Sequence, residues 1–78
     1  MRWTQKRDRD GAPVPRCWVT DSGYTVAELR AGELVAFAVT APGGAEPMAY
    51  RAERDAVLAV IAAHHAGEVV EKFGAGGV

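Results

Sequence analysis

The spacing of apolar residues changes midway along the chain, and this change constrains the fold more than any other feature. Residues 24–40 are predicted to form two β-strands around a reversal at Ala31-Gly32, because β-forming residues alternate there. Residues 51–65 instead repeat apolar positions every three or four residues, as an amphipathic helix does. The loop-forming residues 42–47 separate the two patterns. The chain is therefore expected to belong to the α+β class.

The strand segments predict a small antiparallel sheet of three to four strands, packed by one C-terminal helix. Residues 16–20, 24–30 and 33–40 each hold β-forming side chains between turn residues. Residues 1–5 and 48–50 are candidates for a further short strand. Connections this short favour neighbouring strands that run antiparallel.

The strand predicted at residues 33–40 has two apolar faces. One face carries Val35, Phe37 and Val39, and the other carries Leu34, Ala36 and Ala38. We expect the helix to cover the Val35 face. The Leu34 face is then either covered by the N-terminal segment or exposed as a contact surface, because one helix covers only one face of a sheet.

The helix predicted at residues 51–65 has a clear inward stripe and an ambiguous end. The stripe consists of Val57, Val60, Ile61 and His64. Glu53 and Asp55 are expected in the first turn, where a negative charge favours the helix dipole. Gly67 is a natural stop, yet apolar spacing continues beyond it. Residues 68–73 are therefore either a last helical stretch or a separate short segment.

Length and composition predict one small domain over residues 1–78. Hydrophobic residues make up 49% of the chain, which is enough for a core and argues against wholesale disorder. The glycine-rich residues 74–78 are expected to form a flexible tail. We expect neither a membrane span nor a signal peptide, because no apolar run is long enough. Cys17 has no second cysteine to pair with, which favours a cytoplasmic location.

Charge is distributed unevenly along the chain. The formal net charge is −1, which argues against a simple nucleic-acid binder. Residues 1–16 nevertheless hold five basic and two acidic side chains, whereas residues 31–78 hold three basic and six acidic ones. In a folded domain this asymmetry could produce a basic side and an acidic side.

The residues that could catalyse a reaction or bind a metal ion are better explained by structural roles. His64 and His65 are adjacent, so on a helix they point about 100° apart and do not easily share one metal ion. Cys17 lies in a predicted strand, where a free cysteine is usually a small buried residue. Ser22 belongs to a turn sequence between two strands. We therefore expect no enzyme activity, no cofactor and no metal site.

Aromatic residues offer a second interpretation of the N-terminal half. Trp3, Trp18, Tyr24 and Phe37 could form a platform for stacking bases, next to the basic N-terminal segment. The alternative is that the same side chains fill the core of a small domain. A small nucleic-acid-binding or regulatory module that uses Trp3 is thus an alternative function.

Several short sequence segments follow one another in a recognisable order along the chain. They consist of Arg2-Trp3 near the start, Trp18 followed by Asp-Ser-Gly-Tyr-Thr-Val, an apolar strand that ends in a Pro-Gly loop, and an Ala-rich helix that ends in His64-His65. In this order the chain resembles small accessory proteins of bacteriophages and prophages, some of which are anti-CRISPR proteins. The resemblance implies a protein that acts in the cytoplasm of a bacterial host. Anti-CRISPR proteins share no active-site motif, so no functional residue is carried over.

The resemblance, the small size and the uneven charge together predict a non-catalytic interaction protein. Its expected partner is a bacterial host complex, most plausibly a Cascade-like CRISPR effector that it would keep from binding target DNA. The residues expected to contact the partner are Trp3, Arg7, Arg9, Glu33, Glu46, Glu53 and Asp55. A homodimer through the strand at residues 33–40 is compatible with this function and stays open.

Overall fold

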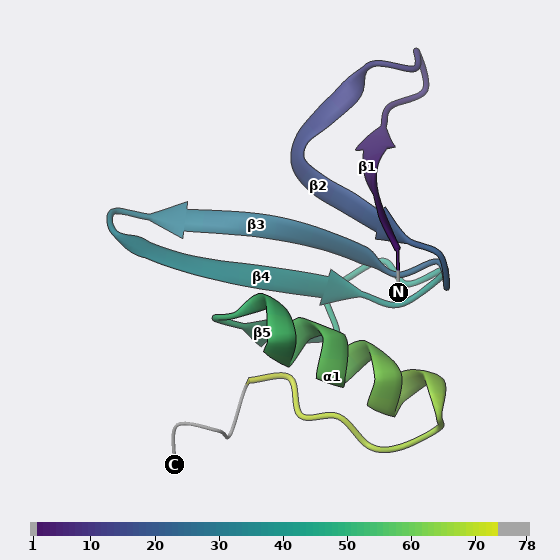
Figure 1. Ribbon diagram of the computed structural model, residues 1–78, viewed down its shortest axis with the longest axis vertical. Coiled ribbons are helices and arrows are strands. Elements are labelled where there is room, and N and C mark those ends of the chain that lie inside the picture. The colour runs from purple at the N-terminus through teal and green to yellow at the C-terminus, as the bar shows by residue number, and fades with distance from the viewer. Residues whose placement is uncertain (1, 74–78) are drawn as a thin grey trace.

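The fold is a five-stranded antiparallel sheet with one helix packed against it (Figure 1). The computed structural model describes residues 2–73, so the tail expected at residues 74–78 lies outside the described part. The elements in chain order are β1 (Trp3–Arg7), β2 (Pro13–Thr20), β3 (Thr25–Ala31), β4 (Leu34–Thr40), β5 (Ala49–Arg51) and α1 (Arg54–His65). Each strand pairs with the next one along the chain. The α+β class is confirmed, and the sheet has five strands rather than three to four.

Helix α1 begins three residues later than residues 51–65 predicted, because β5 uses the first of them. Arg51 pairs with Phe37 of β4, and Glu53 is the N-cap with extended backbone angles of −131° and 151°. Glu53 therefore precedes the first turn, whereas Asp55 lies within it. Within residues 2–73, no helix combines the length and the apolar character needed to cross a lipid bilayer.

Gly67 ends the helix. It has a φ of +86°, and its N–H donates to the carbonyl of His64 while the N–H of Glu68 donates to the carbonyl of Ala63. This pair of bonds is a Schellman motif, which requires a left-handed residue that glycine adopts without strain. The chain beyond it is a separate segment that runs beside β5, where the N–H of Tyr50 donates to the carbonyl of Lys72.

The core lies between one face of the sheet and α1. Val26 and Val39 are opposite one another on β3 and β4, and both are fully buried. Val57, Val60 and Ile61 of α1 are buried against them, as the helical stripe predicted. Full burial of each such side chain contributes about 1.5–3 kcal/mol. Val39 and Phe37 belong to this packing, so the expectation that the helix covers the Val35 face is confirmed.

The opposite face of the sheet has no covering element among the described residues. Strand β1 pairs edge to edge with β2 and therefore does not lie over the Leu34 face. Leu34 remains 75% exposed, and Leu29, which shares its face through the β3–β4 register, remains 47% exposed. This face is therefore exposed at the end that carries Leu34 and buried toward Ala38, which is only 6% exposed. The homodimer that would use it stays a prediction.

Strand β2 contains a bulge that turns the β1–β2 hairpin away from the sheet. From Gln5 to Arg7 β1 advances two residues, whereas its partners run from Trp18 to Pro13, five residues along β2. Arg16 lies within this bulge with a φ of +56°. Figure 1 shows the outer half of the hairpin standing clear of β3 and β4. The extra residues also explain why β2 accommodates two prolines, because only its inner half pairs with β3.

The left-handed conformation of Arg16 predicts an inverted preference between two substitutions. Both Arg16→Gly and Arg16→Ala remove the side chain, but only glycine adopts a positive φ without a steric penalty. In an ordinary strand alanine would be the more stable of the two. Here we expect the glycine variant to be more stable by about 1 kcal/mol in urea unfolding. Equal stability, or a more stable alanine variant, would show that this bulge is not strained.

A polar contact joins the start of β3 to the end of α1. The Tyr24 hydroxyl lies 2.6 Å from His64 Nδ1, and the Tyr24 side chain is buried. Tyr24→Phe should lower the free energy of unfolding by about 1 kcal/mol, because it deletes this hydrogen bond without opening a cavity. Tyr50→Phe is the matched control, since no described residue bonds to the Tyr50 hydroxyl. Equal losses from both variants in urea unfolding would contradict the role of the Tyr24–His64 bond.

Candidate ligand-binding site

A cleft of about 350 Å³ opens between the β1–β2 hairpin and the start of α1. Four strands and the helix each contribute one side chain to its lining. The lining residues are Trp3 of β1, Trp18 of β2, Glu28 of β3, Phe37 of β4 and Arg54 of α1. The helix lies against β4 and β5, so the part of the same sheet face formed by β1 and β2 stays open. The cleft is this uncovered part.

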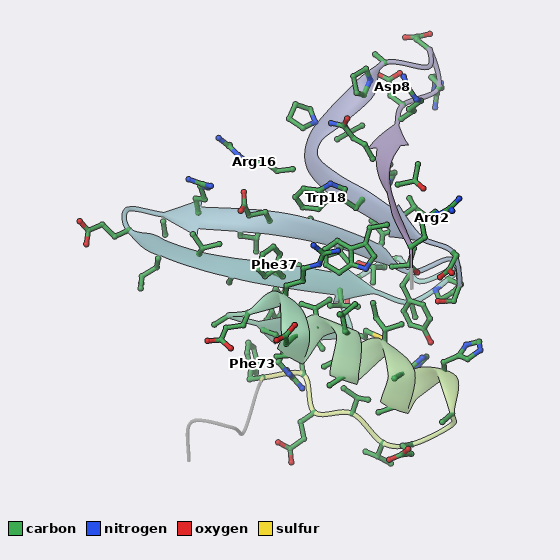
Figure 2. The ribbon with its side chains drawn as sticks, in the orientation of Figure 1. Arg2, Asp8, Arg16, Trp18, Phe37 and Phe73 are labelled. Atoms are coloured by element: carbon green, nitrogen blue, oxygen red, sulfur yellow. The ribbon has the colours of Figure 1, made fainter. Side chains whose placement is uncertain are left out.

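Strand register brings the cleft residues onto one face. Trp18 is opposite Val26, and Glu28 is opposite Phe37. Residues directly opposite one another in an antiparallel pair share a face, and so do residues two apart on one strand. Trp18, Glu28 and Phe37 therefore all project to the side that α1 covers further along. Figure 2 shows Trp18 at the bend of β2 and Phe37 between the ribbons of β3 and β4 in that view.

Two indole rings and a guanidinium form the aromatic wall of the cleft. The ring centroids of Trp3 and Trp18 are 6.0 Å apart with an interplanar angle of 39°. Arg54 Cζ lies 4.5 Å from the centroid of the Trp3 ring. This distance is within the range of a cation–π contact. Arg54 therefore covers one face of the Trp3 ring.

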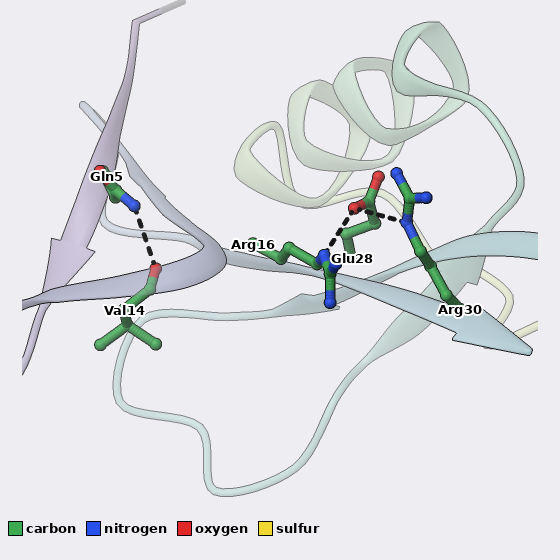
Figure 3. A network of polar contacts seen from close by, with 5 residues as sticks. All are labelled: Gln5, Val14, Arg16, Glu28 and Arg30. Atoms are coloured by element: carbon green, nitrogen blue, oxygen red, sulfur yellow. Dashed lines mark hydrogen bonds and ion pairs between the residues drawn. The ribbon is translucent and has the colours of Figure 1, made fainter.

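Glu28 supplies the one carboxylate of the cleft, and two arginines hold it. Its Oε2 atom lies 3.6 Å from Arg16 Nε and 3.2 Å from Arg30 Nε (Figure 3). The Glu28 side chain is only 15% exposed, whereas the two arginine side chains are 62% and 56% exposed. The carboxylate is therefore fixed within the sheet face, and the guanidinium groups form a cationic rim toward solvent.

Trp3 has an unsatisfied donor. Among the described residues, its Nε1 atom is buried without a hydrogen-bond partner. A buried N–H that lacks an acceptor costs about 1–3 kcal/mol.

The cleft combines three aromatic side chains with one carboxylate and one guanidinium group. Counting Arg16 and Arg30, three guanidinium groups and one carboxylate lie at the cleft, while Glu53 and Asp55 flank Arg54 beside it. Stacking surfaces and a cationic rim are the two resources that the cleft offers.

The residues predicted to contact a partner are dispersed over the structure. Trp3 lines the cleft, whereas Arg7 ends β1 and its Nη1 donates to the carbonyl of Gly11 at the outer turn of the hairpin. Arg9 lies in that turn, beside Asp8, which marks the far end of the hairpin in Figure 2. The basic residues of the hairpin tip are thus separate from the cleft.

The acidic residues of the same prediction do not form one face. Glu33 precedes β4 and Glu46 follows it, so the two lie beyond opposite ends of that strand. Glu53 and Asp55 flank Arg54 at the start of α1. Their position beside Arg54 places them near the cleft, whereas Glu46 is at the far end of β4.

The predicted stacking platform is partly assembled. Trp3, Trp18 and Phe37 line the cleft together, whereas Tyr24 is buried in the core beside His64. Glu28 and Arg54 were not predicted as site residues. A charge at the centre of a strand, two positions from the apolar Val26, is the sequence signal for Glu28.

Histidine and cysteine residues lie apart from the cleft. Cys17 is buried on the opposite side of β2 from Trp18, and His64 contacts Tyr24 at the other end of α1. Within residues 2–73, no three His, Cys, Asp or Glu side chains gather as potential metal ligands.

Comparison with protein families, with characterised proteins and with solved structures gives no match for this chain. The resemblance to small phage proteins therefore rests on the sequence pattern alone.

Proposed function

We propose that the protein is a non-catalytic binding protein that holds a base of single-stranded nucleic acid in the cleft. The observation that carries this proposal is the gathering of Trp3, Trp18 and Phe37 beside the guanidinium of Arg54. Proteins that bind single strands combine aromatic surfaces for the bases with cations for the phosphates. The cleft holds both within one uncovered part of a sheet face.

The energetic contribution of such a site is appreciable even when it is small. Stacking of one base on an aromatic side chain contributes about 1–3 kcal/mol. Arg16, Arg30 and Arg54 surround the stacking surface, and guanidinium groups bind phosphate in a bidentate manner. One or two nucleotides would therefore suffice to use every group that the cleft presents.

The net charge of the chain limits the length of the site. A formal charge of −1 does not support a long phosphate track. The three arginines at the cleft support a short one, with at most three phosphate contacts. The net charge of the chain therefore argues against a long binding site but not against a short one.

Intrinsic fluorescence tests the proposal directly, because both tryptophans of the chain line the cleft. Titration with a short single-stranded DNA oligomer at low salt should quench their emission. With at most three phosphate contacts, the slope of log K against log salt should be shallow, about −2 or less in magnitude. Unchanged emission at low salt would contradict the proposal. A much steeper slope would show that the ligand also contacts basic side chains outside the cleft.

A matched pair of variants locates the binding surface. Trp18→Ala should weaken oligomer binding about tenfold or more, which corresponds to the loss of one stacking contact. Leu34→Ala removes a large side chain from the opposite, exposed face and should leave binding unchanged. Anisotropy of a labelled oligomer measures both variants, and circular dichroism confirms that they fold. Equal affinities for the two variants would remove the cleft as the site.

A second candidate function is the phage-type inhibitor that the sequence pattern implies. The observation that favours it is the same gathering of tryptophan and arginine side chains, the types most enriched at protein–protein hot spots. In this version a side chain of a CRISPR effector complex fills the cleft, in the cytoplasm of the bacterial host, and target DNA is excluded.

Co-purification separates the second candidate from the first. A tagged Cascade-like effector complex should retain the protein, and Trp18→Ala should reduce the retained amount. Cells that express the protein should also lose CRISPR protection against phage. If no tested complex retains the protein and protection is unchanged, the inhibitor function is wrong, whereas the nucleic-acid proposal is unaffected.

A further inference from the structure

We infer that Glu28 makes the cleft selective for a base with an exocyclic amino group, so that cytosine is preferred over thymine or uracil. This inference rests on the proposed binding of a base in the cleft. It assigns to Glu28 a role in recognition, in addition to its ion pairs with Arg16 and Arg30.

The two ion pairs leave one acceptor of Glu28 available. Both arginines contact Oε2, and no described residue engages Oε1. Because the side chain lines the cleft and is largely buried, its carboxylate has little freedom to turn away from a ligand. The geometry therefore presents a fixed acceptor beside the aromatic wall.

The position of Arg16 contributes to this arrangement. A residue with a positive φ in a bulge re-aims its side chain, and Arg16 has its guanidinium directed to Glu28 (Figure 3). The arginines on either side also offset the negative charge of the carboxylate. A phosphate near the rim therefore meets cations first, and Glu28 does not repel the ligand as an isolated carboxylate would.

A fixed hydrogen-bond acceptor distinguishes a base that carries a donor from one that carries an acceptor at the same position. Cytosine carries the N4 amino group, a donor, at the place where thymine and uracil carry the O4 acceptor. An ionised carboxylate only accepts hydrogen bonds, so it pairs with the amino group and opposes the carbonyl. All three pyrimidine rings can stack on Trp18, and the donor–acceptor difference between them is read by Glu28.

The test compares oligocytidine with oligothymidine of equal length, using quenching of tryptophan emission by the unaltered chain. We expect about tenfold tighter binding of oligocytidine, in line with one charged hydrogen bond to a base. Equal affinities, or a preference for oligothymidine, overturn the inference and leave the proposed function standing. If neither oligomer binds, the proposed function itself fails and the inference fails with it.

Two variants separate recognition from structural support. Glu28→Gln keeps the shape of the side chain but adds an amide donor, so the cytosine preference should fall to about twofold or less. Arg54→Ala should weaken both oligomers by the same factor, because its guanidinium does not read the base. An unchanged cytosine preference in Glu28→Gln overturns the inference, whether or not the variant is less stable.

Nucleoside monophosphates test whether the ligand is a free nucleotide or a single strand. Cytidine and uridine monophosphate present the same two bases without a strand. If cytidine monophosphate binds as tightly as oligocytidine and more tightly than uridine monophosphate, Glu28 reads the base of a free nucleotide. If the oligomer binds more tightly and the cytosine preference persists, the ligand is a single strand. Absence of the preference in both series overturns the inference.

Discussion

The rest of the structure depends on the packing of α1 against β4 and β5. Val57 and Ile61 are fully buried against Val26 and Val39, so this contact anchors the helix at one side of the sheet. A helix of twelve residues cannot cover five strands, and the face of β1 and β2 is left without a partner. The candidate site lies on this uncovered part of the sheet. Trp3 and Phe37 pack against the edge of the core, and together with Trp18 they line the cleft.

Local patterns predicted much of this fold, because they act over a few residues. The stripe from Val57 to Ile61 corresponds to an observed element, and the reversal predicted at Ala31-Gly32 lies one residue later, at Gly32 and Glu33. The predicted start of the helix at residue 51 is wrong, because Arg51 pairs with Phe37 in the sheet. Such long-range pairing overrides the helical preference of a short segment. The end at Gly67 was ambiguous until its hydrogen bonds distinguished a cap from a continuing helix.

The site was less predictable, because it depends on how strands register. Trp3, Trp18 and Phe37 were recognisable as aromatic residues, but their convergence follows from three successive strand pairings. The Glu28–Arg16 ion pair depends on the left-handed backbone of Arg16, which a Pro-Arg-Cys sequence does not predict. The interactions that position the carboxylate are thus properties of the assembled sheet rather than of any one segment.

The central claim is that the uncovered cleft beside α1 is the surface that holds the ligand. The indole N–H resonances of Trp3 and Trp18 report on it directly, since these are the two tryptophans of the chain and both line the cleft. In a titration of the ¹⁵N-labelled protein with oligocytidine, both indole signals should shift together with the backbone amide of Glu28. The amide of Leu34, on the opposite, exposed face of the sheet, should not move. A shift confined to Leu34, or no shift at all, would contradict the account.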